Sequence, residues 1–249
     1  MARVLYGGSF NPPHIGHCRL VLEIWESMQH VIDGIDVIPC ARPPHKDGTG
    51  LLPFDLRAEM LENCMEELGF AHVSRMEGER DTPSYTYDTL TDYRKEHPGE
   101  AVYFLVGSHD FFEIPTWFRG RELPSLCHFL LVPRGANDMS GGAFVARTLD
   151  EWPGAVEEPC RELRDMPGAR CVRLLAGSAG DDTRDGARND AHDNVGLVHY
   201  LPLPWFDISA SQVRDLWLRG WHVDYLVPEV VRDMLSWNSH DVHASWDSK

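Results

Sequence analysis

Hydrophobic residues gather in short runs along the chain, separated by longer stretches of mixed polarity. Short, mostly apolar runs of this kind are typical of strands that are buried on both faces of a parallel sheet. The runs lie at residues 3–6, 35–39, 101–106, 128–132 and 197–201. Residues 15–30 and 53–68 instead carry hydrophobic side chains every three or four positions, which predicts amphipathic helices.

The alternation of strands and helices predicts the fold class. It favours a doubly wound α/β fold, in which a parallel sheet with right-handed crossovers carries helices on both faces. Ligands of such sheets bind beyond the carboxyl ends of the strands. Candidate chemistry is therefore expected in the loops that follow the strands.

One domain is predicted for residues 1–236, with an insertion inside it. Residues 176–196 contain five Asp and four Gly but no aromatic, Leu, Ile or Met residue, so they offer little to a core. We expect a flexible acidic insertion there. The C-terminal tail, residues 237–249, is also expected to be loose, unless Trp246 packs against the body of the protein.

Composition narrows the function classes. The 249 residues include 23 Lys and Arg against 39 Asp and Glu, a formal net charge of −16, which argues against nucleic acid and anionic membranes as partners. A hydrophobic fraction of 43% excludes disorder throughout. The six cysteines form no CxxC pair, and the N-terminus lacks the pattern of a signal peptide, so a cytoplasmic location is expected.

The loop after the first predicted strand carries the strongest chemical signal. It reads GGSFNPPHIGH at residues 7–17 and leads into a predicted helix. Glycines let the backbone approach a ligand, and a helix N-terminus offers free N–H groups to a phosphate. His14 and His17, three positions apart, point to the same side of the first turn and suit the charge of a transferred phosphoryl group.

Other interpretations of this loop stay open on the residues alone. Two histidines at this spacing also occur as metal ligands or as surface residues, and a Gly-Gly pair alone is a turn. Neither the dinucleotide fingerprint nor the P-loop pattern is present, and no further zinc ligands stand at matching spacing. We therefore predict no metal ligand in the protein.

The whole string resembles the signature of the H-x-G-H nucleotidyltransferase superfamily, and most closely that of bacterial nicotinate-nucleotide adenylyltransferases. Further matching strings follow in the family's order, and with the flanking pattern they cover nearly all of residues 3–236. They are PPHK at 43–46, PSYTYDTL at 83–90, VGSHDFFEIPTW at 106–117, VPRG at 132–135 and ISASQVR at 208–214. The resemblance implies a Rossmann-like nucleotidyltransferase fold.

The resemblance also implies a reaction in NAD biosynthesis. ATP would give its adenylyl group to nicotinate mononucleotide by direct in-line attack, with release of pyrophosphate. Mg²⁺ is implied as a cofactor held mainly by the substrate phosphates, because their charge exceeds what Lys46 and Arg214 neutralise.

The family's roles transfer to named positions. Catalysis is implied for His14, His17 and Lys46, and ATP binding for Gly8, Ser9, Phe10, His14, His17, Gly107, Ser209, Ser211 and Arg214. Acceptor binding is implied for Lys46, Tyr85, Thr86, His109, Asp110, Trp117 and Arg134. In the family, the residue matching Thr86 recognises the pyridine carboxylate, and the one matching Trp117 stacks on the ring.

Simpler interpretations exist for several of these residues. Without the PPHK context, Lys46 would be interpreted as a surface lysine. Serines such as Ser209 often only cap a helix. Without the motif context, Tyr85 and Trp117 would be interpreted as core residues. Thr86 also suits a helix cap.

One departure from the family pattern bears on the acceptor. His109 stands where the family usually has aspartate, with Asp110 next to it. An acceptor other than nicotinate mononucleotide therefore stays open, whether nicotinamide mononucleotide or another phosphorylated compound. So does a regulator that binds nucleotide without turnover, whereas an acidic structural protein without a ligand fits the first loop poorly. A homo-oligomer is left open.

Overall fold

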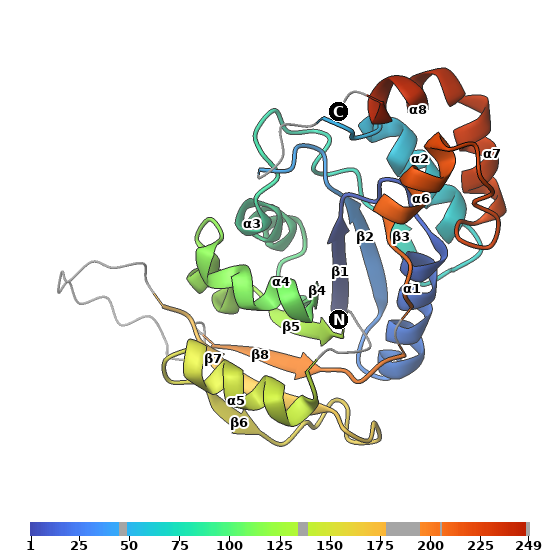
Figure 1. Ribbon diagram of the computed structural model, residues 1–249. Helices are drawn as coiled ribbons and strands as arrows, with labels where there is room; N and C mark the ends of the chain where they lie inside the picture. Colours follow the sequence, from blue (N-terminus) through green and yellow to red (C-terminus); the bar gives the residue numbers. More distant parts are fainter. Residues whose placement is uncertain (45–48, 134–138, 178–194, 205, 248–249) are drawn as a thin grey trace. The chain divides into compact units, whose positions relative to one another are not determined.

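The chain divides into two compact units, each assembled from two separate stretches of sequence. The computed structural model (Figure 1) describes residues 1–44, 49–133, 139–177, 195–204 and 206–247. Unit 1 comprises residues 1–4 and 86–205, and unit 2 comprises residues 5–85 and 206–249. Strand β1 (Ala2–Gly8) contributes residues to both units. The chain therefore passes from one unit to the other three times.

Unit 2 contains the first half of the predicted strand and helix pattern. Its strands run in the order β3-β2-β1, and β2 and β3 are parallel. Strand β2 is buried at every position, as the apolar run predicts. The elements besides β1 are β2 (Gly34–Pro39), β3 (Ala71–Val73), α1 (Ile15–Met28), α2 (Phe54–Met65), α6 (Ala210–Leu218), α7 (Glu229–Trp237) and α8 (Ser239–Trp246).

The C-terminal helices of unit 2 pack together beside α2, as Figure 1 shows in red, orange and cyan. Their shared core joins residues from both stretches of the unit, including Leu52, Met60, Val231 and Trp246. The expectation of a loose tail at residues 237–249 is therefore wrong, because α8 occupies most of it and Trp246 is only 2% exposed. Packing of Trp246 against the body is confirmed.

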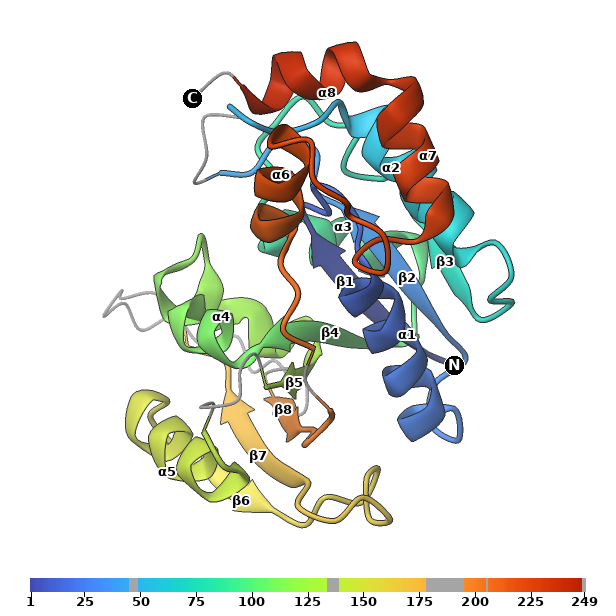
Figure 2. The same ribbon diagram turned by 45° about the vertical axis from the view of Figure 1, so that its right-hand side comes forward.

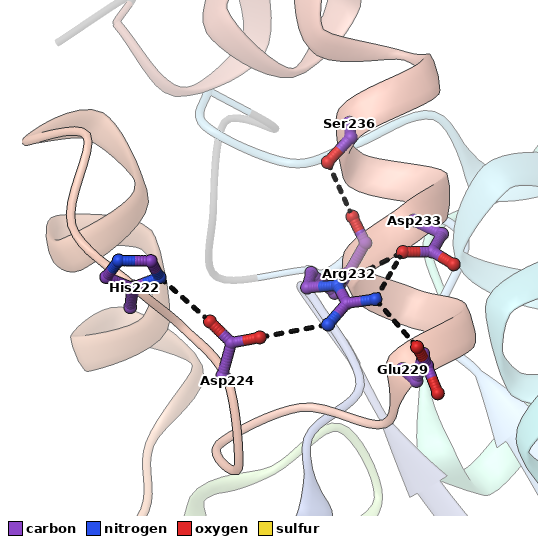
Figure 3. A network of polar contacts seen from close by, with 6 residues as sticks. All are labelled: His222, Asp224, Glu229, Arg232, Asp233 and Ser236. Atoms are coloured by element: carbon purple, nitrogen blue, oxygen red, sulfur yellow. Dashed lines mark hydrogen bonds and ion pairs between the residues drawn. The ribbon is translucent and has the colours of Figure 1, made fainter.

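A network of charged side chains holds the loop between α6 and α7 (Figure 3). Arg232 on α7 donates hydrogen bonds to Asp224, Glu229 and Asp233, at 2.9, 2.9 and 2.8 Å. The other oxygen of Asp224 contacts the ring of His222 at 3.0 Å. Arg232 and His222 hold the pKa of the Asp224 carboxyl below its usual range. The loop that follows α6 is thus tied to the first turns of α7.

Unit 1 contains a sheet whose last two strands are antiparallel. Within it, β1, β4, β5, β8, β7 and β6 follow one another in that order. Strand β5 is parallel to both β4 and β8, whereas β7 is antiparallel to both β8 and β6. The strands are β4 (Ala101–Gly107), β5 (His128–Val132), β6 (Val156–Glu158), β7 (Arg170–Leu175) and β8 (Val195–Tyr200).

The helices of unit 1 bring an aromatic core onto this sheet. Figure 2 shows α5 lying along β6 and β7. Phe144 of α5 is fully buried and its ring stacks on Tyr200 of β8. The helical elements are α3 (Thr86–Glu96), α4 (Ser108–Glu113) and α5 (Gly141–Glu151), with short 3-10 turns at Ile114–Thr116 and Gly120–Ser125.

The predicted α/β class is confirmed, because the eight strands of the described residues form a mostly parallel sheet with helices. The predicted C-terminal boundary of the insertion, residue 196, is two residues too late, because Val195 and Gly196 belong to β8. A Cβ atom on Gly196 would lie 2.8 Å from the carbonyl oxygens of Pro124 and Cys127, so this position is tightly packed. Residues 178–194 lie outside the described part. None of the described helices is long and apolar enough to span a membrane.

Candidate active site

The loop after β1 folds back on itself over a glycine. Phe10 has φ of +46°, in the left-handed region, and its side chain is only 2% exposed. The ring covers Gly8 so closely that a Cβ atom there would lie 3.0 Å from it. The absence of a side chain at Gly8 therefore leaves room for the ring of Phe10 in this turn.

His14 and His17 meet at the start of α1. His14 is the N-cap residue, and the two imidazole rings stack with centroids 3.6 Å apart. Gly16 makes room for this arrangement, since a Cβ atom there would lie 3.0 Å from Nδ1 of His14. The prediction that both rings gather at the first helical turn is confirmed.

A backbone hydrogen bond orients the ring of His17. The amide of His14 donates to Nδ1 of His17 at 3.1 Å. When one ring nitrogen of a neutral imidazole accepts, the proton resides on the other. Nε2 of His17 therefore carries the hydrogen, and His17 is set as a donor toward an anion. Phe10 packs edge-on against the same ring, with centroids 4.9 Å apart.

Asn11 fixes the loop between the glycines and the histidines. Its side-chain amide donates to the carbonyl of Gly50 at 2.6 Å, and its Oδ1 accepts from the amide of Leu52 at 3.0 Å. The same oxygen also accepts from the indole of Trp246 at 3.4 Å. Asn11 is 6% exposed, so these bonds form where water does not replace them. Sequence reasoning quoted Asn11 within the motif but assigned it no role.

Arg57 holds the first loop through a hydrogen bond, and this role was not predicted from the sequence. This side chain on α2 is fully buried. Its Nη1 donates to the carbonyl of Ser9 at 2.6 Å and its Nε to the carbonyl of Leu52 at 2.9 Å. Burial lowers its pKa to about 10, with Cys40 and Glu77 opposing the shift, so the group stays charged at neutral pH. Its place on the apolar face of α2, four positions before the buried Leu61, was the signal available.

The second helix N-terminus adds Arg214. Its Nη1 donates to the carbonyl of Asn11 at 2.6 Å, and its Nη2 donates to Oγ of Ser211 at 3.0 Å. Burial lowers its pKa from the usual value. Ser209 caps α6, because its hydroxyl accepts from the amide of Gln212 at 3.1 Å. The simpler interpretation of Ser209 as a cap therefore holds in this structure, while Arg214, which also bonds Ser211, joins α6 to the first loop.

The start of α1 is anchored a third time. The amide of Ile15 donates to the carbonyl of Leu226 at 2.9 Å. Leu226 belongs to the loop that Arg232 and Asp224 tie to α7 (Figure 3). The helix terminus that bears the histidines is thus held by α2, α6 and the loop before α7, all within unit 2.

The residues expected at the acceptor are placed mostly in unit 1. Thr86 is the first residue of α3, and Tyr85 precedes it as the last residue of its stretch of unit 2. Gly107, which was expected to bind ATP, is buried and is the N-cap of α4. His109 is exposed in the first turn of that helix, beside Asp110. Trp117 ends the 3-10 turn after α4 and is half-buried. Lys46 and Arg134 lie outside the described residues.

The unit 2 residues bring together groups that are chemically suited to an anion. Two imidazoles and two guanidinium groups surround a loop whose carbonyl oxygens are already bonded, and two helix N-termini add their positive dipole ends. Among the residues that the structure describes, no group of three or more His, Cys, Asp or Glu side chains is arranged to hold a metal ion. The chemistry that this half of the site supports is the binding of phosphates and the stabilisation of negative charge on them.

The chain is similar to a protein family and to named relatives. A family profile described as Cytidylyltransferase-like matches residues 5–216. A protein of Pseudomonas putida strain GB-1 named probable nicotinate-nucleotide adenylyltransferase is 36% identical over 228 residues, which cover 91% of this chain and 89% of the relative. A protein of Geobacter metallireducens with the same name is 32% identical over 227 residues, covering 91% of this chain and 92% of its own.

A solved structure shows the same fold. The nicotinic acid mononucleotide adenylyltransferase of Plasmodium falciparum, complexed with NaAD, superposes with a TM-score of 0.64 at 16% identity, covering 100% of this chain and 99% of that one. The fold, the H-x-G-H loop at the start of α1 and the identity to relatives over nine-tenths of the sequence agree. The chain belongs to the cytidylyltransferase-like family and, within it, to the nicotinate-nucleotide adenylyltransferases.

Proposed function

We propose that this protein transfers the adenylyl group of ATP to nicotinate mononucleotide, giving nicotinate adenine dinucleotide and pyrophosphate. The observation that carries the proposal is the stacked pair of His14 and His17 at the start of α1, in a loop held by Arg57 and Arg214. The identity of 36% to a relative that carries this activity in its name supports it.

The reaction needs alignment and charge stabilisation more than proton transfer. The phosphate of the acceptor is ionised near neutral pH, so one of its oxygens attacks the α-phosphorus of ATP directly. The new P–O bond forms as the bond to the bridging oxygen of the β-phosphate breaks, and pyrophosphate leaves. His17 donates from Nε2 to the phosphate oxygens, where negative charge builds up during the transfer.

The loop residues hold this donor in place. Asn11 and Arg57 leave the loop little freedom, so the histidines need no rearrangement when the substrate arrives. Arg214 is already bonded to the loop carbonyl of Asn11, and its guanidinium extends the positive charge toward α6. We propose that Lys46, Ser209 and Ser211 add phosphate contacts, as the family resemblance implies.

Mg²⁺ belongs to this proposal as a partner of the substrate. The residues present fit that arrangement, because the described part of the chain offers phosphate donors and no cluster of three carboxylate, thiol or imidazole ligands. When bound, the ion neutralises the charge of the triphosphate and of the leaving pyrophosphate. A protein cage is not needed for that role, since Mg²⁺ commonly keeps several waters.

The acceptor half of the proposal is carried by the family resemblance. Thr86 and Trp117 would receive the pyridine carboxylate and ring, and the resemblance implies further acceptor contacts for Tyr85, Asp110 and Arg134. His109, at the position of the family's usual aspartate, keeps nicotinamide mononucleotide as the second candidate acceptor, because a neutral imidazole both donates and accepts hydrogen bonds.

An acceptor panel tests the proposal. Purified protein with ATP and Mg²⁺ is offered nicotinate mononucleotide, nicotinamide mononucleotide or phosphopantetheine, and pyrophosphate and dinucleotide are measured. A strong preference for nicotinate mononucleotide is expected. Turnover with another acceptor would overturn the assigned substrate, and ATP binding without turnover on any acceptor would favour a nucleotide-binding regulator.

A further inference from the structure

Two cysteines and a histidine, none of them assigned to the proposed function, come together in unit 1. Cys171 on β7 pairs in register with His199 on β8 and with Glu158 on β6. Cys160 follows β6 by two residues, and its Sγ lies 3.8 Å from Nδ1 of His199. The hairpin of β6 and β7 therefore places two thiols and one imidazole in one cluster, although the cysteines show no CxxC spacing.

The cluster is buried on one side and reachable on the other. His199 is 0% exposed, and within the described part of the chain its Nε2 has no hydrogen-bond partner. Cys171 is 2% exposed, whereas Cys160 is half-buried. Both cysteines line a surface cavity of about 450 Å³ together with Glu157, Pro159 and Arg170. Of the two thiols that line this cavity, Cys160 is thus the more accessible to a small reagent.

The contacts make Cys160 the more acidic thiol. The Cys171 thiol donates a hydrogen bond to the sulfur of Cys160, which lowers the pKa of Cys160 to about 5 and raises that of Cys171. Burial opposes this effect, and the hydrogen bond from His199 adds to it. Glu162 also faces the site, with its carboxylate 3.9 Å from Nδ1 of His199. Of the two thiols, Cys160 is therefore the one that ionises more readily, and Cys171 is its hydrogen-bond donor.

We propose that Cys160 and Cys171 form a redox-active dithiol site whose substrate is a hydroperoxide. The thiolate of Cys160 attacks the terminal oxygen of the hydroperoxide, so that an S–O bond forms, the O–O bond breaks, and the leaving alkoxide (hydroxide for hydrogen peroxide) takes up a proton. The sulfur of Cys171 then attacks the sulfenic acid, an S–S bond forms, and its proton leaves with the hydroxyl group as water. Two electrons pass from the thiol pair to the peroxide. A thiol reductant reverses the change.

The first experiment maps oxidation in the full-length protein. Reduced protein is treated with equimolar hydrogen peroxide, quenched with an alkylating agent and digested without reductant for mass spectrometry. A peptide pair joined through Cys160 and Cys171, lighter by two hydrogen atoms and restored by dithiothreitol, is expected to be the main product. Oxidation spread evenly over all six cysteines, or absence of this pair while Cys160 proceeds to sulfinic acid, would overturn the proposal.

The second experiment measures the thiolate itself. Alkylation of Cys160 is expected to change little between pH 6 and pH 8, whereas an ordinary thiol gains roughly tenfold per pH unit in this range. Cys40 is the internal reference, because burial raises its pKa to about 11. At pH 7, Cys160 should react roughly tenfold or more faster than Cys40. Equal rates, or a steep pH dependence at Cys160, would contradict the assignment.

Variants separate the two sulfur roles. Cys171→Ser should leave Cys160 as a sulfenic acid that a dimedone probe captures, and Cys160→Ser should leave Cys171 unoxidised at the same dose. Circular dichroism of both variants checks the fold, and Cys127→Ser is the matched control that keeps the joined pair. Tight binding of one Zn²⁺ that protects both thiols in the wild type would instead make the cluster a metal site and overturn the proposal.

Discussion

Arg57 donates a hydrogen bond from Nη1 to the carbonyl oxygen of Ser9 at 2.6 Å, across 48 positions of sequence. The same guanidinium bonds the carbonyl of Leu52, so one buried cation joins the first loop to the segment before α2. A charge in this position is costly unless its hydrogen bonds are made. The hydrogen bonds to Ser9 and Leu52 therefore offset the desolvation of the buried guanidinium and fix the geometry of the loop.

Replacement of Arg57 should therefore reduce activity more than stability. Arg57→Met removes both loop bonds but also the cost of burying a charge, so the two effects on unfolding offset each other. The KM for ATP should rise roughly tenfold, because about 1.4 kcal/mol of ordering is lost from the loop. Arg57→Lys should raise the KM for ATP as well, because a single ammonium group does not reach both the Ser9 and the Leu52 carbonyls.

A surface arginine gives the matched control for that measurement. Arg75 bonds Glu62 and Asp55 at the surface, and its side chain is 38% exposed. Arg75→Met should leave ATP kinetics unchanged, because exposed ion pairs contribute little. An Arg57→Met enzyme with wild-type KM and kcat would remove Arg57 from the loop's support.

The orientation of His17 predicts a difference between two amide replacements. An asparagine at 17 keeps an acceptor near the Nδ1 position, so it retains the bond from the His14 amide but loses the Nε2 donor. A glutamine places its NH₂ group close to the lost Nε2. His17→Asn should lower kcat by ~10² or more, and His17→Gln should recover part of that loss.

Steady-state kinetics with ATP binding measured separately checks this prediction. Both variants should bind ATP within a few-fold of wild type and should show the wild-type far-ultraviolet spectrum, because the fold does not depend on Nε2. Near-normal turnover by His17→Asn would exclude Nε2 as the donor to the transferring phosphate.

Asn11 should be a stability residue as well as a loop residue. Asn11→Ala leaves the buried amide of Leu52 and the part-buried carbonyl of Gly50 without their partner, each at a cost of about 1–3 kcal/mol. Urea unfolding should therefore show a loss of roughly 2–4 kcal/mol. Trp246→Phe, which removes only the longer 3.4 Å bond, should lose about 1 kcal/mol or less. The reverse order would mean that the indole is the main anchor of the loop.

His128 should make the protein less stable in mild acid. Burial, together with the neighbouring His199, lowers the pKa of His128 to about 4 in the folded state, and its Nδ1 accepts from the amide of Leu197 at 3.1 Å. The unfolded chain binds a proton near the ordinary value of 6.5, so protonation favours unfolding. The contribution of neutral His128 to the free energy of unfolding is complete above pH 6.5. It declines as the pH falls toward 4, by about 2 kcal/mol between pH 6.5 and 5.

Unfolding of wild type and His128→Asn at a series of pH values isolates this contribution. Asparagine retains an acceptor for the Leu197 amide but does not titrate, so its stability should fall less steeply below pH 6.5. Parallel curves for the two proteins would show that His128 is protonated equally in both states.

His109 should tolerate the residue that the family usually carries. It is exposed in the first turn of α4, where a carboxylate interacts favourably with the helix dipole, so the fold should not change. His109→Asp should preserve or raise turnover with nicotinate mononucleotide in the acceptor panel. A collapse of turnover with that acceptor, with ATP binding intact, would show that His109 has a role of its own in this protein.

Much of the scaffold could be predicted from the sequence because it depends on local patterns. The apolar runs mark β1, β2, β4, β5 and β8, and the H-x-G-H string marks the turn into α1. In contrast, β6 has the sequence VEE and is mostly exposed, so no hydrophobic run reveals it. Helix α8 buries only Val242 and Trp246, too few apolar positions to distinguish it from a loose tail.

The supporting residues of the site could not be predicted for a different reason. An arginine in a helix is exposed by default, and only the packed structure shows that Arg57 faces the loop carbonyls. The bonds of Asn11 reach Gly50, Leu52 and Trp246, and no local pattern reports contacts at such separations. The histidines proposed to contact the ligand could therefore be predicted from the sequence. The residues that hold them in position, Asn11 and Arg57, could not.

The bond between Asn11 and Trp246 joins residues 235 positions apart, and Arg214 reaches the same loop across 203. During translation the first loop leaves the ribosome early, but two of its anchors are synthesised near the other end of the sequence. A nascent chain can form β1 and α1 at once, yet the loop between them gains its final shape only after Trp246 has emerged.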